Sequence, residues 1–224
     1  MRLPTIRSEK DLAKAVNDLG FLPFFRSAVP GFSIEEHIAP EYWFPDEGEG
    51  VWEWKGPVIQ LSGCAYGKFF QNKAVFVSKE WFPHLANYRR DGYDFDARYD
   101  DGLATYKEKR VYDALAEAGS MRAKELKRAS GFVGEDMKGF DGVLTRLQSR
   151  CYLLMAAFEY AVDRYGKPYG WGLARYTTPE AYFGPTFGET VYRCSPQESN
   201  EKLWSHLSSI LPNATEEQLK KLLG

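Results

Sequence analysis

The sequence predicts an α+β protein whose second half is a winged-helix unit, that is, a helix-turn-helix followed by a β-wing. Two observations predict it. Three stretches with helical periodicity follow one another between residues 103 and 151. Two β-prone stretches, 152–158 and 171–176, then flank a turn that contains glycine and proline. The order helix, helix, helix, strand, wing loop, strand is that of a winged helix.

The first half is expected to begin with a helix, because apolar residues recur at helical spacing between Ser8, a capping residue, and Gly20. The segment 35–53 follows with seven acidic residues and neither lysine nor arginine. Its prolines and glycines predict a long acidic surface loop. A short helix is expected over 51–61, with Pro57 in its first turns or at a kink.

A β-hairpin is predicted next, from β-prone residues at 65–70 and 74–77 around a polar turn. Ser78 is expected to cap a helix that ends near Arg90. This helix and hairpin region precedes the winged helix, and the length of the chain leaves room for a second, degenerate winged helix.

The three helices of the winged helix are expected at 103–118, at 121–129 with Ser120 as its cap, and from Asp141 onward. The third has an apolar face and an opposite polar face. Its apolar face is formed by Val143, Leu144, Leu147 and Cys151, and its polar face by Gly142, Thr145, Arg146, Ser149 and Arg150.

Three further helices are expected to start at Thr178, Ser195 and Thr215, each followed by residues that favour a helical first turn. The predicted organisation is therefore an N-terminal α/β-hairpin region over 1–99, a winged-helix domain over 100–183, and a C-terminal helical extension over 184–224 that packs on the body.

Composition excludes several classes of protein. The formal charge is −2, from 29 Lys and Arg against 31 Asp and Glu, so the chain is neither a generally basic nucleic-acid coat nor a polybasic membrane binder. Three widely spaced cysteines predict neither disulfides nor a metal site, and they fit the cytoplasm. No signal peptide, membrane span or phosphate-binding glycine motif occurs, so no membrane association and no nucleotide or other cofactor is expected.

Basic residues gather in the predicted winged helix, where residues 101–176 carry 13 Lys and Arg against 10 Asp and Glu. They predict contacts with double-stranded DNA, through phosphates and base edges. The alternative is a solvated helix face on a scaffold. The predicted DNA-binding residues are Arg122, Lys124, Lys127, Arg128, Lys138, Thr145, Arg146, Ser149, Arg150, Arg164 and Lys167.

Seven short motifs support a family resemblance. They are Val51-Trp-Glu-Trp-Lys55, Ala65-Tyr-Gly-Lys-Phe-Phe70, Glu80-Trp-Phe-Pro83, Asn87-Tyr-Arg-Arg-Asp-Gly-Tyr-Asp-Phe-Asp96, Lys138-Gly-Phe-Asp141, Leu144-Thr-Arg-Leu-Gln148 and Tyr169-Gly-Trp-Gly172. With them the chain resembles the AlkZ-related winged-helix proteins, distant relatives of bacterial DNA glycosylases that unhook crosslinks and remove bulky alkylated purines. The resemblance implies a winged-helix fold and association with DNA. The Gln-x-Gln or Gln-x-Asp pair that those glycosylases use to position water is absent.

Chemistry, where there is any, is expected at three carboxylates, Asp94, Asp96 and Asp100, because neighbouring carboxylates suit acid–base catalysis. Asp96 is favoured for its apolar sequence neighbours. Helix capping and pairing with Arg98 explain the same cluster. Five aromatic residues are candidates for a pocket that stacks on a flipped base, although aromatic residues that border a hairpin are more often its core: Trp52, Trp54, Tyr66, Trp81 and Tyr93.

Three functions follow from these observations. The first is a DNA-associated protein that recognises damaged or alkylated duplex. The second is a glycosylase variant that hydrolyses an N-glycosidic bond with a carboxylate in place of the missing glutamine pair. The third is a small-molecule or protein-binding module on a winged-helix scaffold.

Overall fold

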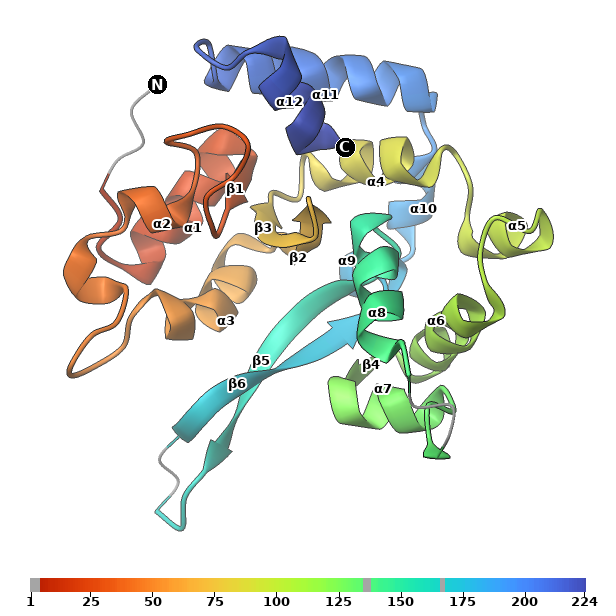
Figure 1. Cartoon of the computed structure of the whole chain (residues 1–224), viewed down its shortest axis with the longest axis horizontal. Coiled ribbons are helices and arrows are strands. Elements are labelled where there is room, and N and C mark those ends of the chain that lie inside the picture. The colour runs from red at the N-terminus through yellow and green to blue at the C-terminus, as the bar shows by residue number, and fades with distance from the viewer. Residues whose placement is uncertain (1–4, 135–137, 166–167) are drawn as a thin grey trace.

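Two three-stranded antiparallel sheets, with helices packed around them, form the protein in a computed structural model (Figure 1). The structure describes residues 5–134, 138–165 and 168–224. The predicted α+β class is confirmed. Within the described residues, no helix is both long and apolar enough to cross a membrane.

The first sheet has the strand order β1-β3-β2. Its strands are β1 (Phe21–Pro23), β2 (Ala65–Phe70) and β3 (Lys73–Val77). The predicted hairpin is thus confirmed. Its turn residues, Gln71 and Asn72, both have positive φ, 49° and 58°, as a two-residue turn between twisted strands requires.

Six helical segments accompany this sheet in the first half of the chain. They are α1 (Glu9–Leu19), α2 (Ile34–His37), the 3-10 helix η1 (Pro40–Tyr42), α3 (Val51–Ser62), α4 (Phe82–Arg90) and α5 (Phe95–Asp100). The boundaries of α1 are confirmed, since Ser8 Oγ accepts a hydrogen bond from the Asp11 N–H and Gly20 ends the helix at φ 76°.

Two predictions for this half were wrong in part. The segment 35–53 is not one long loop, because Ile34 is fully buried and anchors α2, while Ser33 donates a hydrogen bond to the Glu36 carboxylate. Ser78 does not cap α4. Its N–H donates to the carbonyl of Gly20, which prolongs the pairing of the sheet, and the helix starts only at Phe82.

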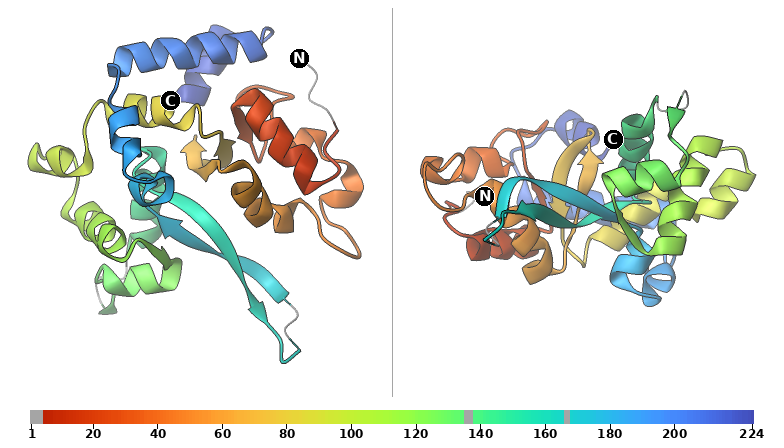
Figure 2. Two further views of the ribbon diagram at one scale, coloured as in Figure 1. Left: turned by 180° about the vertical axis from the view of Figure 1, so that it is seen from behind. Right: turned by 90° about the horizontal axis from the view of Figure 1, so that it is seen from below.

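The second sheet has the strand order β4-β6-β5 and is made of β4 (Ser120–Arg122), β5 (Leu154–Val162) and β6 (Pro168–Thr177). The predicted strand pair is confirmed and is longer than expected. As a hairpin, β5 and β6 project from the body of the protein in Figures 1 and 2. Ser120 was wrongly expected to cap a helix. It lies in β4 opposite Thr177, because β4 pairs with the edge of β6 that β5 does not occupy.

The helices of the second half are α6 (Tyr106–Ala118), α7 (Ala123–Ala129), α8 (Phe140–Ser149), α9 (Pro179–Phe183), α10 (Thr186–Val191), α11 (Pro196–Ile210) and α12 (Glu216–Leu223). Thr178, Ser195 and Thr215 cap α9, α11 and α12 as predicted. Asp141 does not cap α8, since Gly139, at φ 91°, occupies that position and Asp141 lies in the first turn.

The buried apolar residues form one cluster that extends from Ile6 to Leu223. Contacts within it cross both predicted domain boundaries. Helix α8 packs on β2, and α11 packs on α4. Arg90 of α4 adds a polar link, because its guanidinium donates to the carboxylate of Glu180 in α9. The three-part division of the chain stays a prediction.

Candidate nucleic-acid interface

Helix α8 presents one face to the core and one to solvent, as its sequence pattern predicts. Val143, Leu144 and Leu147 are at most 4% exposed, whereas Arg146 is exposed. Gln148 fixes this orientation. Its Oε1 accepts a hydrogen bond from the Lys68 N–H (3.2 Å), where the pairing of β2 with β3 is irregular, and its Nε2 donates to the carbonyl of Leu144. The solvent face of α8 is therefore held in place by β2.

The two arginines of α8 share a buried partner. The Arg146 Nε lies 3.1 Å and the Arg150 Nη1 3.6 Å from Oε1 of Glu108, whose side chain is 2% exposed. The other carboxylate oxygen accepts hydrogen bonds from the N–H and the hydroxyl of Thr105 at the start of α6. Arg146 and Arg150 remain 49% and 35% exposed, so both can still reach a ligand.

Glu108 stays ionised in this position. Burial alone would raise the pKa of the carboxyl, but the Thr105 hydrogen bonds and the Arg146 guanidinium outweigh it and lower the pKa below its usual value. Glu108 is not among the site residues predicted from the sequence, although Thr105-x-x-Glu108 is a capping-box signature that places it in the first turn of a helix.

Four other predicted DNA-binding side chains carry charge without a carboxylate partner among the described residues. They are Lys124, Lys127, Arg128 and Lys138. Lys124, Arg128 and Lys138 are exposed, and Lys127 is half-buried. Because α7 packs on β4 and β6, its cations lie beside the base of the β5–β6 hairpin.

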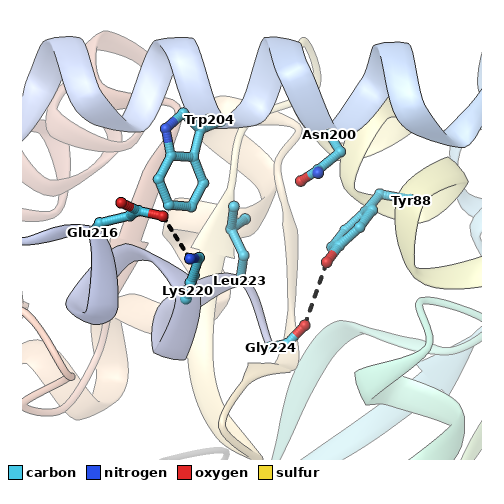
Figure 3. A pocket seen from close by; sticks show the side chains of 7 residues that line it. All are labelled: Tyr88, Asn200, Trp204, Glu216, Lys220, Leu223 and Gly224. Atoms are coloured by element: carbon cyan, nitrogen blue, oxygen red, sulfur yellow. Dashed lines mark hydrogen bonds and ion pairs between the residues drawn. The ribbon is translucent and has the colours of Figure 1, made fainter.

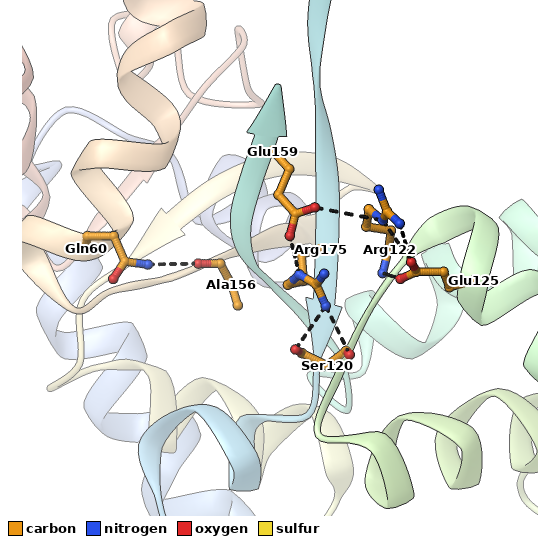
Figure 4. Close-up of polar contacts among 7 residues, drawn as sticks. All are labelled: Gln60, Ser120, Arg122, Glu125, Ala156, Glu159 and Arg175. Carbon is orange, nitrogen blue, oxygen red and sulfur yellow. Dashed lines mark hydrogen bonds and ion pairs between the residues drawn. The ribbon is translucent and has the colours of Figure 1, made fainter. Parts of the chain in front are cut away.

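Arg122, by contrast, is neutralised. Its guanidinium pairs with Glu125 and lies 3.8 Å from Glu159 of β5, which in turn pairs with Arg175 of β6 (Figure 4). Arg175 also donates to the carbonyl and hydroxyl of Ser120. This network joins the first turn of α7 to all three strands of the second sheet, so Arg122 has a structural role here.

The remaining predicted residues of this surface differ in their surroundings. The Ser149 hydroxyl donates a hydrogen bond to the carbonyl of Arg146, and Thr145 is half-buried. Near the end of β5, the Arg164 guanidinium lies 4.7 Å from the ring centre of Tyr165, which is 78% exposed. Lys167 lies outside the described residues.

The five candidate aromatic residues are distributed over different environments. Trp54 and Tyr66 are buried in the core, and Trp81 stacks on His206 with ring centres 3.9 Å apart. Trp52 belongs to a cluster of aromatic rings, and Tyr93 is half-buried. The structure therefore does not bring the five rings to one pocket among the described residues.

Lys55 had no signal in the sequence, yet it lies among aromatic rings between α3 and β5. Its Nζ is 4.6 Å from the ring centre of Phe158, 4.9 Å from that of Trp52 and 5.8 Å from that of Phe24. Burial lowers the pKa of the Lys55 ammonium, while Glu53 opposes this shift.

The three candidate carboxylates lie on or next to the short helix α5. Asp94 is the N-cap of α5, and its carboxylate accepts a hydrogen bond from the Ala97 N–H (2.8 Å). The Asp96 carboxylate lies 3.2 Å from the Lys109 ammonium of α6. The side chain of Asp96 is 74% exposed, whereas Phe95 is buried, because neighbouring residues on a helix point in different directions. Asp100 is exposed. The apolar sequence neighbours of Asp96 thus do not surround its carboxylate.

A hollow of about 450 Å³ lies at the opposite end of the protein from the hairpin. It is lined by Tyr88, Asn200, Trp204, Glu216, Lys220, Leu223 and Gly224 (Figure 3). An ion pair joins Glu216 to Lys220 at its rim. No predicted DNA-binding residue lines it. Nor do three His, Cys, Asp or Glu side chains come together as a metal site anywhere in the described residues.

Among the comparisons with known proteins, one gives a match, which is to a family model. Neither a curated protein nor a solved structure matches the chain. A family model described as "AlkZ related" matches residues 6–224, which is nearly the whole sequence. The chain belongs to the AlkZ-related family.

Proposed function

We propose that this protein is a winged-helix, DNA-associated protein that binds duplex DNA with α7, α8 and the β5–β6 hairpin. The order of elements, α6-β4-α7-α8-β5-β6, and the strand order β4-β6-β5 support the winged-helix interpretation. Helix α8 is then the recognition helix, and the hairpin is the wing.

One observation carries the proposal: in a protein that is acidic overall, cations without a carboxylate partner among the described residues are exposed on α7 and, at Lys138, just before α8. Lys124 and Arg128, four residues apart on α7, face solvent on the same side of the helix. Cations that face solvent in this way can contact the phosphates of a duplex. The relation of the family to DNA glycosylases favours damaged or alkylated duplex as the ligand.

Removal of the two exposed positive charges of α7 tests whether this helix contacts DNA. In the double variant Lys124→Gln, Arg128→Gln, duplex binding measured by fluorescence anisotropy should weaken, because two phosphate contacts are lost. The slope of log K against log salt should become shallower by about 1.8, which is about 0.9 for each contact. The matched control is Lys10→Gln, Lys79→Gln, two exposed lysines of the first half. Equal losses in both double variants would contradict the proposed surface.

Charge reversal at Arg146 and Arg150 is a poorer test, because it would place three carboxylates together around Glu108 and destabilise the fold. Neutral substitutions on α7 avoid this difficulty, since Lys124 and Arg128 have no carboxylate partner among the described residues. A loss of binding there reports on the surface and not on unfolding.

The glycosylase alternative depends on Asp96. If the Asp96 carboxylate activates water, Asp96→Asn should abolish base release from alkylated duplex. Asp113→Asn is the matched control, because Asp113 is the other carboxylate paired with Lys109. Equal release by wild type and both variants would exclude Asp96 as the group that activates water. No release by any of them would leave DNA association without base excision.

A further inference from the structure

Cys194, which lies just before α11, differs from the other two cysteines in its surroundings. Cys64 and Cys151 are fully buried, and burial raises the pKa of each thiol to about 12. Cys194 is only half-buried. Two thiols are thus protected and inert at neutral pH, whereas the third is open to reagents.

Three side chains from two helices converge on the sulfur of Cys194. The Ser199 hydroxyl lies 3.5 Å, the Lys202 Nζ 3.8 Å and the His84 Nδ1 3.9 Å from Sγ. The hydroxyl and the ammonium can donate hydrogen bonds to a thiolate, and the imidazole can accept the thiol proton. The sulfur therefore has two donors and one base beside it, the groups that assist attack by a thiol.

Asn87, which is 1% exposed, holds Cys194 and Ser199 in these positions through two hydrogen bonds. Its Nδ2 donates to the carbonyl of Cys194 (2.7 Å) and to the hydroxyl oxygen of Ser199 (2.9 Å). With its oxygen accepting from Asn87, the Ser199 hydroxyl has its own proton to donate to His84 or to the sulfur.

His84 is suited to act as the base. Burial, assisted by the Lys202 ammonium, lowers the pKa of its imidazole, and Glu80 opposes this shift. The ring is therefore neutral near pH 7 and has an acceptor nitrogen free to take a proton.

From this geometry we propose that Cys194 is a covalent modification site, a nucleophilic thiol that reacts with small, soft carbon electrophiles. In the reaction, the thiol proton passes to His84 Nδ1 and the sulfur attacks the electrophilic carbon. An S–C bond forms as the bond from carbon to the leaving group breaks, and the leaving group departs with the electron pair. Lys202 and Ser199 stabilise the thiolate before attack. The site is independent of the DNA-binding surface.

Iodoacetamide at pH 7, with the labelled peptide identified by mass spectrometry, tests the site. Cys194 should be labelled before Cys64 and Cys151, with iodide released. Lys202→Met and His84→Gln should each slow labelling about threefold or more, because the first removes the positive charge beside the sulfur and the second removes the group that takes the thiol proton. Lys202→Arg should keep the rate, because it restores the positive charge.

Two controls separate activation from simple exposure. Lys221→Met removes an exposed lysine of α12 and should leave the rate unchanged. In urea, all variants should react alike, because the arrangement exists only in the folded chain. A wild-type rate in folded Lys202→Met or His84→Gln, or faster labelling of Cys64 or Cys151, would overturn the proposal.

Discussion

Replacement of Arg90 by methionine should lower the free energy of unfolding by about 3 kcal/mol, the lower end of the range for breaking a buried ion pair, because the Glu180 side chain is 38% exposed. The Arg90 side chain is 1% exposed. Its guanidinium donates to the Glu180 carboxylate at 2.7 Å, to the Tyr192 hydroxyl at 3.2 Å and to the Cys151 carbonyl at 2.8 Å, and it lies over the ring of Tyr152.

The effect should be large because these partners come from distant parts of the chain. Glu180 belongs to α9, Tyr192 directly follows α10, and Cys151 lies two residues after the end of α8. Methionine fills much of the volume but donates no hydrogen bond, so the carboxylate and the carbonyl lose their buried donor.

Urea unfolding followed by tryptophan fluorescence measures this loss. Arg193→Met is the control, because Arg193 is exposed and has no carboxylate partner among the described residues. The double variant Arg90→Met, Glu180→Met should be more stable than Arg90→Met alone, since it no longer leaves a carboxylate without its cation. A similar small loss for Arg90→Met and Arg193→Met would show that the buried pair contributes little.

Glu108→Gln should cost about 1.5–3 kcal/mol at pH 7, the range for hydrogen bonds that involve a charged group. Glutamine can still close the capping box with Thr105, but it has no charge to offer Arg146 and Arg150. Glu198→Gln is a closely matched control. Glu198 occupies the same capping-box position in α11, with Ser195 in place of Thr105, but it is exposed and has no ion-pair partner among the residues that the structure describes.

The difference between wild type and Glu108→Gln should depend on pH. The pKa of Glu108 is lower in the folded chain than its usual value of 4.5, so the folded state binds the proton less tightly than the unfolded state. Its contribution is complete above about pH 4.5 and declines as the pH falls toward the folded pKa. Unfolding at pH 7 and pH 3 should therefore show a smaller difference at pH 3, and an equal difference at both would contradict the assignment.

Prediction from sequence succeeded where the signal was local. The cap at Ser8 with the stop at Gly20, the cap at Ser195 and the turn at Gln71-Asn72 each depend on backbone hydrogen bonds between residues close in the chain. It failed at Ser78 and Ser120, where the same residue type is used in strand pairing with a distant segment.

The candidate DNA-binding residues show the same limit. Their positions on α7 and α8, and the division of α8 into an apolar and a polar face, follow from composition and periodicity. Whether each of these cations has a carboxylate partner does not follow from composition or periodicity. Arg122 is neutralised by Glu125 and Glu159, whereas Lys124 has no carboxylate partner in the part of the chain that the structure describes.

The α+β class, most helix and strand boundaries, the paired strands of the hairpin and the family resemblance follow from the sequence alone. Three features depend on the folded structure: which cations lack a carboxylate partner, the contact of Glu108 with the arginines of α8, and the meeting of His84 and Lys202 at Cys194. The two groups of features differ in the sequence separation of the residues that interact. Helical periodicity, caps and turns are set by interactions over about four residues, whereas these contacts join segments up to 110 residues apart through the packing of α4 on α11 and of α6 on α8.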